Sequence, residues 1–237
     1  MSPAEQLPGK SPRRIATLDG WRAVAIFFVI LDHACQHTRF HEAFWARLGN
    51  FGVDIFFVVS GYIITSRLLE ERRQTSAINL SNFYRRRTFR ILPIVVTYLC
   101  ALLLLSLRID LVDFHRSELV GALCFFRNYQ LAADVRGIFT AHFWSLSIEE
   151  HFYLLWPGLL VLLGNRRALF LAMAGAVTSG ALRTFELIHP IGAFQHMRGG
   201  AIILRTEMRL DGLMLGSAAA ILLTDPRVRT FIFRNFP

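Results

Sequence analysis

The stretch TLDGWRAVAIFFVILDHACQHT, residues Thr17–Thr38, decides how the rest of the sequence is interpreted. Its apolar run from Ala23 to Leu31 predicts a membrane helix with ionisable residues inside it. Arg22 and His33 are eleven residues apart, about three turns and roughly 16 Å of rise, so a helix places them on one face. An ionisable residue at mid-bilayer is costly, and by default it lines a polar cavity or a reaction path.

The composition predicts a polytopic, all-α membrane protein. The 237 residues are 54% hydrophobic, and several apolar runs are too long for the core of a soluble protein of this size. The formal net charge of +9 comes mostly from arginines in short clusters between these runs, which is the pattern of the positive-inside rule. We therefore expect membrane lipid, and no nucleic acid, as a partner. The three cysteines lack metal-type spacing, so no metal is expected.

The order of apolar and basic segments predicts about six spans, with both ends of the chain in the cytoplasm. Arg67 to Arg90 holds seven arginines, too many to translocate cheaply, and should be cytoplasmic. The third span should have its helix start at Pro93, because proline suits a first helical turn. Residues 1–15 form a basic cytoplasmic tail, and residues 16–237 form a domain of the cell (inner) membrane. The expected spans fall within residues 17–38, 51–69, 91–107, 143–163, 168–188 and 207–223.

The segment between Glu118 and Arg127 is too short to cross a membrane. It contains only eight residues without charge, so we expect a lipid-facing or re-entrant segment on the outer side. The alternative, a true span over residues 117–133, would invert every later segment. It would put the basic stop Arg166-Arg167 outside.

Two groups of residues in or beside the spans suggest chemistry. His33 is a candidate general base, because imidazole titrates near neutrality, although a buried, merely satisfied histidine is the alternative. Glu149 lies among aromatic residues and could position a sugar or polarise the histidine. The alternative for that segment is an aromatic belt at the outer interface.

Other charged residues have simpler explanations as well. Asp19 with Arg22, and Arg183 with Glu186, stand at i,i+3 and could be structural ion pairs. The arginine-rich run from residue 85 to residue 90 could be only a topology signal. However, Arg86, Arg87 and Arg90 fall within about one helical turn, where their guanidinium groups could hold phosphates bidentately.

Five segments, in order along the chain, resemble the acyltransferase-3 family of membrane acyltransferases. The string FWSLSIEEHFYLLWP, residues 143–157, is nearly the family's most recognisable motif, with His151 where glutamine is common. A single match would be weak, but the ordered set is specific and covers residues 16 to about 223. The matching segments are LDGWR with His33, residues 52–62, residues 86–93, residues 143–157 and residues 209–216.

The resemblance implies an integral membrane O-acyltransferase. Such an enzyme would transfer an acyl group, with acetyl expected, from cytoplasmic acyl-CoA to a hydroxyl of a carbohydrate or glycolipid. Family members have about ten spans, so the chain is expected to lack several helices beyond Pro237. The implied catalytic residues are His33, Arg22 and Glu149; the acyl-CoA-binding residues are Arg86, Arg87 and Arg90; the substrate-binding residues are Trp144, Ser147, Tyr153 and Asp211.

Two other functions fit part of the pattern. A transporter or permease of an anionic solute also needs embedded acid, histidine and arginine residues. Neither inverted repeats nor paired broken helices are visible in the sequence, which argues against it. The second alternative is an inactive, truncated member of the family.

Overall fold

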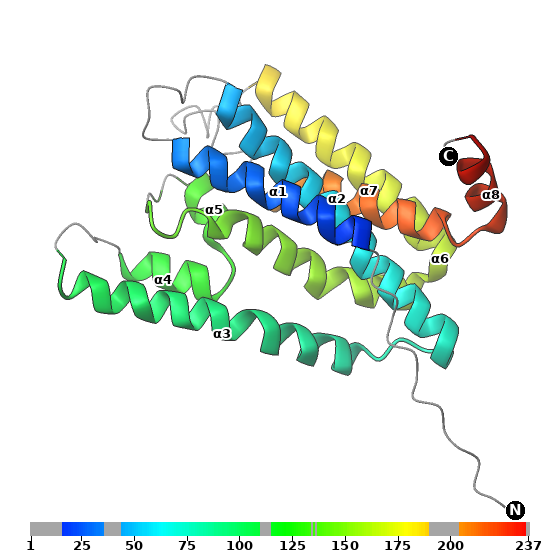
Figure 1. Ribbon diagram of the computed structural model, residues 1–237, viewed down its shortest axis with the longest axis horizontal. Coiled ribbons are helices and arrows are strands. Elements are labelled where there is room, and N and C mark those ends of the chain that lie inside the picture. Colours follow the sequence, from blue (N-terminus) through cyan, green and yellow to red (C-terminus); the bar gives the residue numbers. More distant parts are fainter. Residues whose placement is uncertain are drawn as a thin grey trace, which may run out of the picture. The chain divides into compact units, whose positions relative to one another are not determined.

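The computed structural model describes residues 16–35, 44–109, 115–133, 135, 137–189 and 204–235. All regular structure in these ranges is helical, which confirms the all-α prediction (Figure 1). The predicted tail, residues 1–15, lies outside them. The helices are α1 (Ala16–Cys35), α2 (Phe44–Thr75), α3 (Leu80–Ser106), α4 (Arg116–Leu123), α5 (Arg127–Ala132), α6 (Phe143–Ile188), α7 (Thr206–Leu222) and α8 (Pro226–Asn235).

Three of these helices are long and apolar enough to span a membrane, so six spans are not confirmed. The three are Leu48–Thr75, Leu80–Ser106 and Phe143–Glu186. The first predicted span forms α1, but Asp19, Arg22 and Asp32 make it more polar than an ordinary membrane helix. The last predicted span forms α7, which has only 17 residues. A helix of that length barely crosses the hydrocarbon core.

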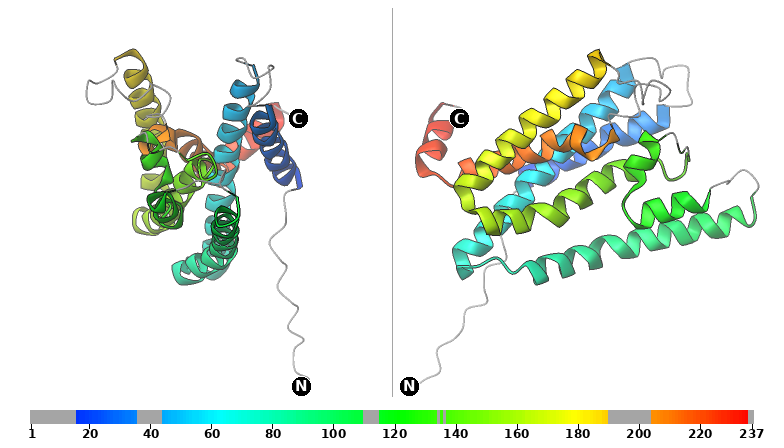
Figure 2. Two further views of the ribbon diagram at one scale, coloured as in Figure 1. Left: turned by 90° about the vertical axis from the view of Figure 1, so that its left-hand side faces the viewer. Right: turned by 180° about the vertical axis from the view of Figure 1, so that it is seen from behind.

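Gly164 divides α6 into two arms. Its φ of 68° and ψ of 174° are non-helical, and glycine adopts this conformation at low cost because it has no Cβ. Figures 1 and 2 show the second arm folding back from this point. Each arm has about the 20 residues that a span requires. The break lies between the predicted spans 143–163 and 168–188.

The third helix begins thirteen residues before the predicted start at Pro93, which was wrong. The Asn79 side chain accepts a hydrogen bond from the Asn82 N–H at 2.9 Å and caps the helix at Leu80. Asparagine is among the strongest N-cap residues. The helix then continues through Pro93, where the missing N–H costs one backbone hydrogen bond. The arginine-rich run consequently lies on the helix itself.

Two short helices, α4 and α5, form the segment around Glu118 and Arg127, which was predicted to be re-entrant. They are separated by a turn in which Phe125 has a positive φ of 53°, a conformation that a bulky residue rarely adopts. A continuous span over residues 117–133 is therefore excluded. Whether the segment is re-entrant stays a prediction.

The chain divides into two compact units, residues 1–59 and residues 60–237. In the first unit, α1 runs antiparallel to the beginning of α2, and two glycines of α2 allow the close approach. A Cβ on Gly52 would lie 2.7 Å from the Ala25 carbonyl oxygen, and one on Gly49 would collide with the Asp32 side chain. Small residues at such contacts are how membrane helices pack closely.

Gly52→Ala is expected to destabilise this helix pair by about 1–3 kcal/mol, because the added methyl group must push α1 away. Gly20→Ala is the matched control, since a Cβ there meets nothing within 4 Å. That change should be neutral or slightly stabilising. Thermal unfolding of both variants in nanodiscs, followed by circular dichroism, checks the difference. Equal melting temperatures would contradict the close packing.

In the second unit, a chain of buried hydrogen bonds joins α2, α6 and α7. Trp156 Nε1 donates to Thr65 Oγ1 at 2.8 Å, and Thr65 Oγ1 donates to Ser217 Oγ at 3.0 Å. All three side chains are buried. Gly61 permits this contact, because a Cβ there would collide with the Leu213 backbone.

The segments predicted on each side of the membrane gather at opposite ends of this unit. Arg72 at the end of α2 hydrogen-bonds Asn165 beside the α6 kink, and both were predicted cytoplasmic. At the other end, Tyr129 of α5 hydrogen-bonds Glu207 at the start of α7, at 2.9 Å. The sides of the membrane on which these two ends lie stay a prediction.

Candidate functional site

His33 lies in the last turn of α1 with a defined tautomer. Its side chain is exposed, and its Nδ1 lies 2.8 Å from the carbonyl oxygen of Val29, one turn earlier. A carbonyl oxygen can only accept, so Nδ1 carries a proton, and in the neutral imidazole the lone pair is then on Nε2. The hydrogen bond thus presents His33 Nε2 as a proton acceptor, which is what a general base requires.

Arg22 is held at the opposite end of the same helix by a ring of α2. Its guanidinium carbon lies 5.2 Å from the centre of the Phe56 ring, in a cation–π contact. The eleven-residue spacing puts Arg22 and His33 within about 20° of each other around α1. The predicted common face therefore exists. The guanidinium contacts Phe56 rather than forming the alternative ion pair with Asp19.

Three residues that were predicted to have different roles, one catalytic, one acyl-CoA-binding and one substrate-binding, meet between α3 and α6. The Arg87 guanidinium carbon lies 3.5 Å from the centre of the Tyr153 ring, and the Tyr153 hydroxyl donates to Glu149 Oε1 at 2.6 Å. Tyr153 and Glu149 are buried, with 2% and 6% of their surfaces exposed. The Glu149 carboxylate offsets part of the cost of bringing Arg87 to this buried ring.

The predicted arginine cluster is divided between two faces of α3. Arg86 and Arg90 are exposed and one turn apart, whereas Arg87 turns towards Tyr153. Successive residues on a helix diverge by about 100°, so the three guanidinium groups do not converge. Arg86 also forms an ion pair with Glu71 of α2, in which Nη2 lies 3.6 Å from Oε2.

The remaining predicted binding residues are engaged within the protein. Ser147 is fully buried, and its hydroxyl donates to the Phe143 carbonyl at 2.8 Å. The Arg209 guanidinium carbon lies 5.4 Å from the centre of the Trp144 ring. Asp211 forms a two-point contact with Arg183, whose Nη2 lies 2.6 Å from Oδ2. Arg183 thus pairs with Asp211 and not with Glu186, the alternative partner from the sequence.

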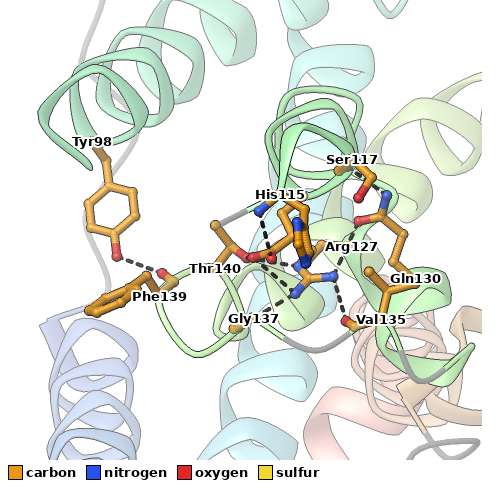
Figure 3. A network of polar contacts seen from close by, with 10 residues as sticks. Tyr98, His115, Ser117, Arg127, Gln130, Val135, Gly137, Phe139 and Thr140 are labelled. Atoms are coloured by element: carbon orange, nitrogen blue, oxygen red, sulfur yellow. Dashed lines mark hydrogen bonds and ion pairs between the residues drawn. The ribbon is translucent and has the colours of Figure 1, made fainter. Parts of the chain in front are cut away.

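A buried polar network in α4, α5 and the loop after them was missed by sequence reasoning (Figure 3). Arg127 is fully buried; its Nε donates to Thr140 Oγ1 at 2.9 Å, and its Nη2 lies 3.5 Å from Glu118 Oε2. Thr140 in turn donates to Glu118 at 2.8 Å. Burial lowers the pKa of Arg127, and the Glu118 charge opposes that shift. The signal in the sequence was a lone acid and a lone base bounding an apolar run.

Within the described ranges, no three histidine, cysteine or acidic side chains are grouped to hold a metal ion. The chemical groups that the described residues offer at the predicted positions include the His33 imidazole and the exposed guanidinium groups of Arg86 and Arg90.

Comparisons with known proteins give one consistent family. O-acetyltransferase OatA of Staphylococcus aureus strain NCTC 8325 / PS 47 is 32% identical over 228 residues, covering 90% of this chain and 35% of the relative; OatA of strain MRSA252 gives the same values. SACOL0978 of strain COL is 33% identical over 227 residues, with the same coverage. The chain thus spans about a third of the length of these relatives. No solved structure matches it.

The family match covers most of the segments from which the resemblance was drawn. A family model described as "Acyltransferase domain" matches residues 15–196. This range contains α1 with Arg22 and His33, the arginine-rich start of α3 and the first arm of α6. The chain therefore belongs to the acyltransferase-3 family.

Proposed function

We propose that this chain forms the membrane part of an O-acyltransferase. It moves an acyl group, acetyl in the first instance, from cytoplasmic acyl-CoA to a hydroxyl of a carbohydrate or glycolipid. The observation that carries the proposal is the Nδ1 hydrogen bond of His33 to Val29, at 2.8 Å, which directs a basic Nε2 away from the helix. Membership of a family whose relatives are named O-acetyltransferases supports the same reaction.

His33 serves as the general base. Its Nε2 takes the proton of the acceptor hydroxyl as that oxygen attacks the thioester carbonyl, and a C–O bond forms. The C–S bond then breaks, and coenzyme A leaves as a thiolate that takes the proton back from His33. Arg22, on the same face of α1, supplies positive charge for the oxyanion that develops on the carbonyl oxygen.

The exposed arginines of α3 bind the donor. Arg86 and Arg90 are one turn apart, so two guanidinium groups can reach neighbouring phosphates of one acyl-CoA molecule. They lie near the end of the second unit where Arg72 meets Asn165. We place this end and the N-terminus in the cytoplasm, with the protein in the cell (inner) membrane, because the arginine clusters favour that side.

Transfer of radiolabel from acetyl-CoA tests the function directly. Membrane vesicles containing the chain receive labelled acetyl-CoA on the cytoplasmic face, and the label is then measured in carbohydrate and in glycolipid. We expect ester-linked label that mild base releases. Vesicles that carry anionic solutes across the membrane but form no ester would favour the permease alternative and overturn the proposal.

The double substitution Arg86→Gln/Arg90→Gln is expected to raise the KM for acetyl-CoA by about tenfold or more, because two charge-assisted phosphate contacts are lost. The kcat should change little, since neither residue contacts the reacting carbonyl. Arg73→Gln/Arg85→Gln is the matched control: it removes the same two charges from exposed positions of α2 and α3, where Arg73 pairs with Glu70 at 2.7 Å and Arg85 donates to Asn82 at 3.1 Å. An equal rise in KM for both variants would show that only the net charge matters.

A further inference from the structure

Three rings gather at the end of the second unit that we place outside. The Phe126 and Tyr129 rings are stacked, with centroids 4.7 Å apart and planes 28° apart. The His151 ring lies 5.9 Å from Tyr129 and 6.3 Å from Phe126. We call Phe126, Tyr129 and His151 the aromatic cluster. It joins α6 to the short α5 and its preceding turn.

Buried polar side chains lie beside the His151 ring of the aromatic cluster. His151 Nδ1 lies 2.7 Å from Thr206 Oγ1, and Asn128 Nδ2 donates to the same hydroxyl at 2.9 Å. Thr206 and Asn128 are buried, and the second amide atom of Asn128, Oδ1, is buried without a hydrogen bond to any described residue. The His151 ring is therefore bound by a buried hydroxyl group.

A charged edge borders the cluster. The Tyr129 hydroxyl donates to Glu207 at 2.9 Å, Glu207 pairs with Arg205, and the Arg205 guanidinium carbon lies 5.9 Å from the centre of the Tyr129 ring. Burial raises the pKa of Tyr129, so its hydroxyl remains a donor at neutral pH. The Arg205 and Glu207 side chains are about a third exposed, at 29% and 34%.

This arrangement argues against two ordinary explanations. Phe126 is 51% exposed, so the cluster is not simply core packing. An ion pair beside the exposed ring would be costly in hydrocarbon, so the cluster is not simply a lipid-facing surface. Phe125, the residue before Phe126, has an unfavourable positive φ of 53°. Such backbone strain is found mainly where function requires it.

We propose that the aromatic cluster and its Arg205–Glu207 edge form a binding subsite for one pyranose ring of a neutral carbohydrate. The exposed Phe126 ring would stack on the C–H face of the sugar, because both of these surfaces are apolar. The carboxylate of Glu207 and the guanidinium of Arg205 would bind neighbouring hydroxyls, one as acceptor and one as donor. Because the edge carries one negative charge, on Glu207, and one positive charge, on Arg205, a neutral sugar fits better than a charged one. The inference rests on the proposed function for its acceptor class.

Direct binding to the purified 237-residue chain in nanodiscs tests the subsite. The probes are a β-1,4-linked N-acetylglucosamine tetrasaccharide and maltotetraose, measured by saturation-transfer NMR and titration calorimetry. We expect the wild type to bind at least one of them. Phe126→Ala should weaken that affinity by about tenfold, the effect of losing one good ring contact. Phe126→Trp should keep the affinity within about threefold, because it retains an aromatic face.

Two further variants make the test specific. Tyr129→Phe keeps the ring but releases Glu207, and should weaken binding by about twofold to fivefold. Ile138→Ala removes an apolar side chain that lies outside the cluster and is more exposed than Phe126, at 79% against 51%, and it should bind as the wild type does. Helical circular dichroism and a single elution peak establish that each variant is folded.

The outcomes separate the subsite from the proposed function. The subsite is overturned if the wild type binds neither sugar. It is also overturned if Phe126→Ala and the wild type bind equally well, even if acetyl transfer continues. Selective loss in Phe126→Ala with retention in Phe126→Trp supports it. If the wild type binds the sugar through Phe126 but never forms an ester from acetyl-CoA, the subsite stands and the proposed acyltransferase function fails.

Discussion

Replacing His33 with alanine is expected to lower the kcat of acyl transfer by about 10²–10⁴-fold, the usual contribution of a positioned general base. The structure gives the reason: the Nδ1 hydrogen bond to Val29, at 2.8 Å, fixes the tautomer and leaves Nε2 as the proton acceptor. The KM for acetyl-CoA should change little, because the exposed arginines of α3, and not His33, are proposed to hold the phosphates. Steady-state transfer of labelled acetyl groups in vesicles measures both constants.

A chemical test distinguishes a base from a structural histidine. Added imidazole should restore part of the activity of His33→Ala, since a small base can enter the space that the side chain leaves. His189→Ala is the control: His189 is also exposed at the end of a long helix, and should show neither loss nor rescue. A His33→Ala variant that keeps kcat within about tenfold of the wild type would contradict the assignment.

The part of the fold that sequence predicts well depends on local signals. The basic stop Arg166-Arg167 separates the predicted spans 143–163 and 168–188, and the structure has a break with a positive φ just before it, at Gly164. Runs of apolar residues predict the long helices because length and composition alone decide whether a helix can cross a membrane. The start of α3 was missed because Pro93 was taken as its first helical position, whereas Asn79 is the N-cap and the helix continues through Pro93.

The candidate site is less predictable, since pairing of side chains depends on tertiary structure. The sequence places Arg86 and Arg87 together, but the helix points one outward and the other at Tyr153, more than sixty residues away. Arg183 finds Asp211 on α7 rather than the nearer Glu186. Which side chains pair depends on how the helices pack against one another, and no local sequence pattern specifies that packing.

The buried pair Glu118–Arg127 should have the largest effect on stability of any pair in the second unit. Both side chains are almost completely buried, at 2% and 0% exposed, and the two charges lie 3.5 Å apart. Arg127→Met would leave the Glu118 carboxylate buried without its counter-charge. The expected destabilisation is about 3–5 kcal/mol, which thermal unfolding in nanodiscs would detect. Arg116→Met, at an exposed position of α4, is the control and should lie within about 0.5 kcal/mol of the wild type.

The double variant Glu118→Leu/Arg127→Met decides why the pair is costly to break. If an uncompensated charge is the cause, removing both charges should restore most of the lost stability, since apolar residues of similar volume often replace a buried ion pair at little cost. Arg127 also donates to Thr140 and to the Val135 carbonyl, each at 2.9 Å. If the double variant is as unstable as Arg127→Met, those hydrogen bonds, and not charge pairing, hold α5 and the following loop in place. A double-mutant cycle with Thr140→Val would then show coupling to Arg127 of about 0.5–3 kcal/mol.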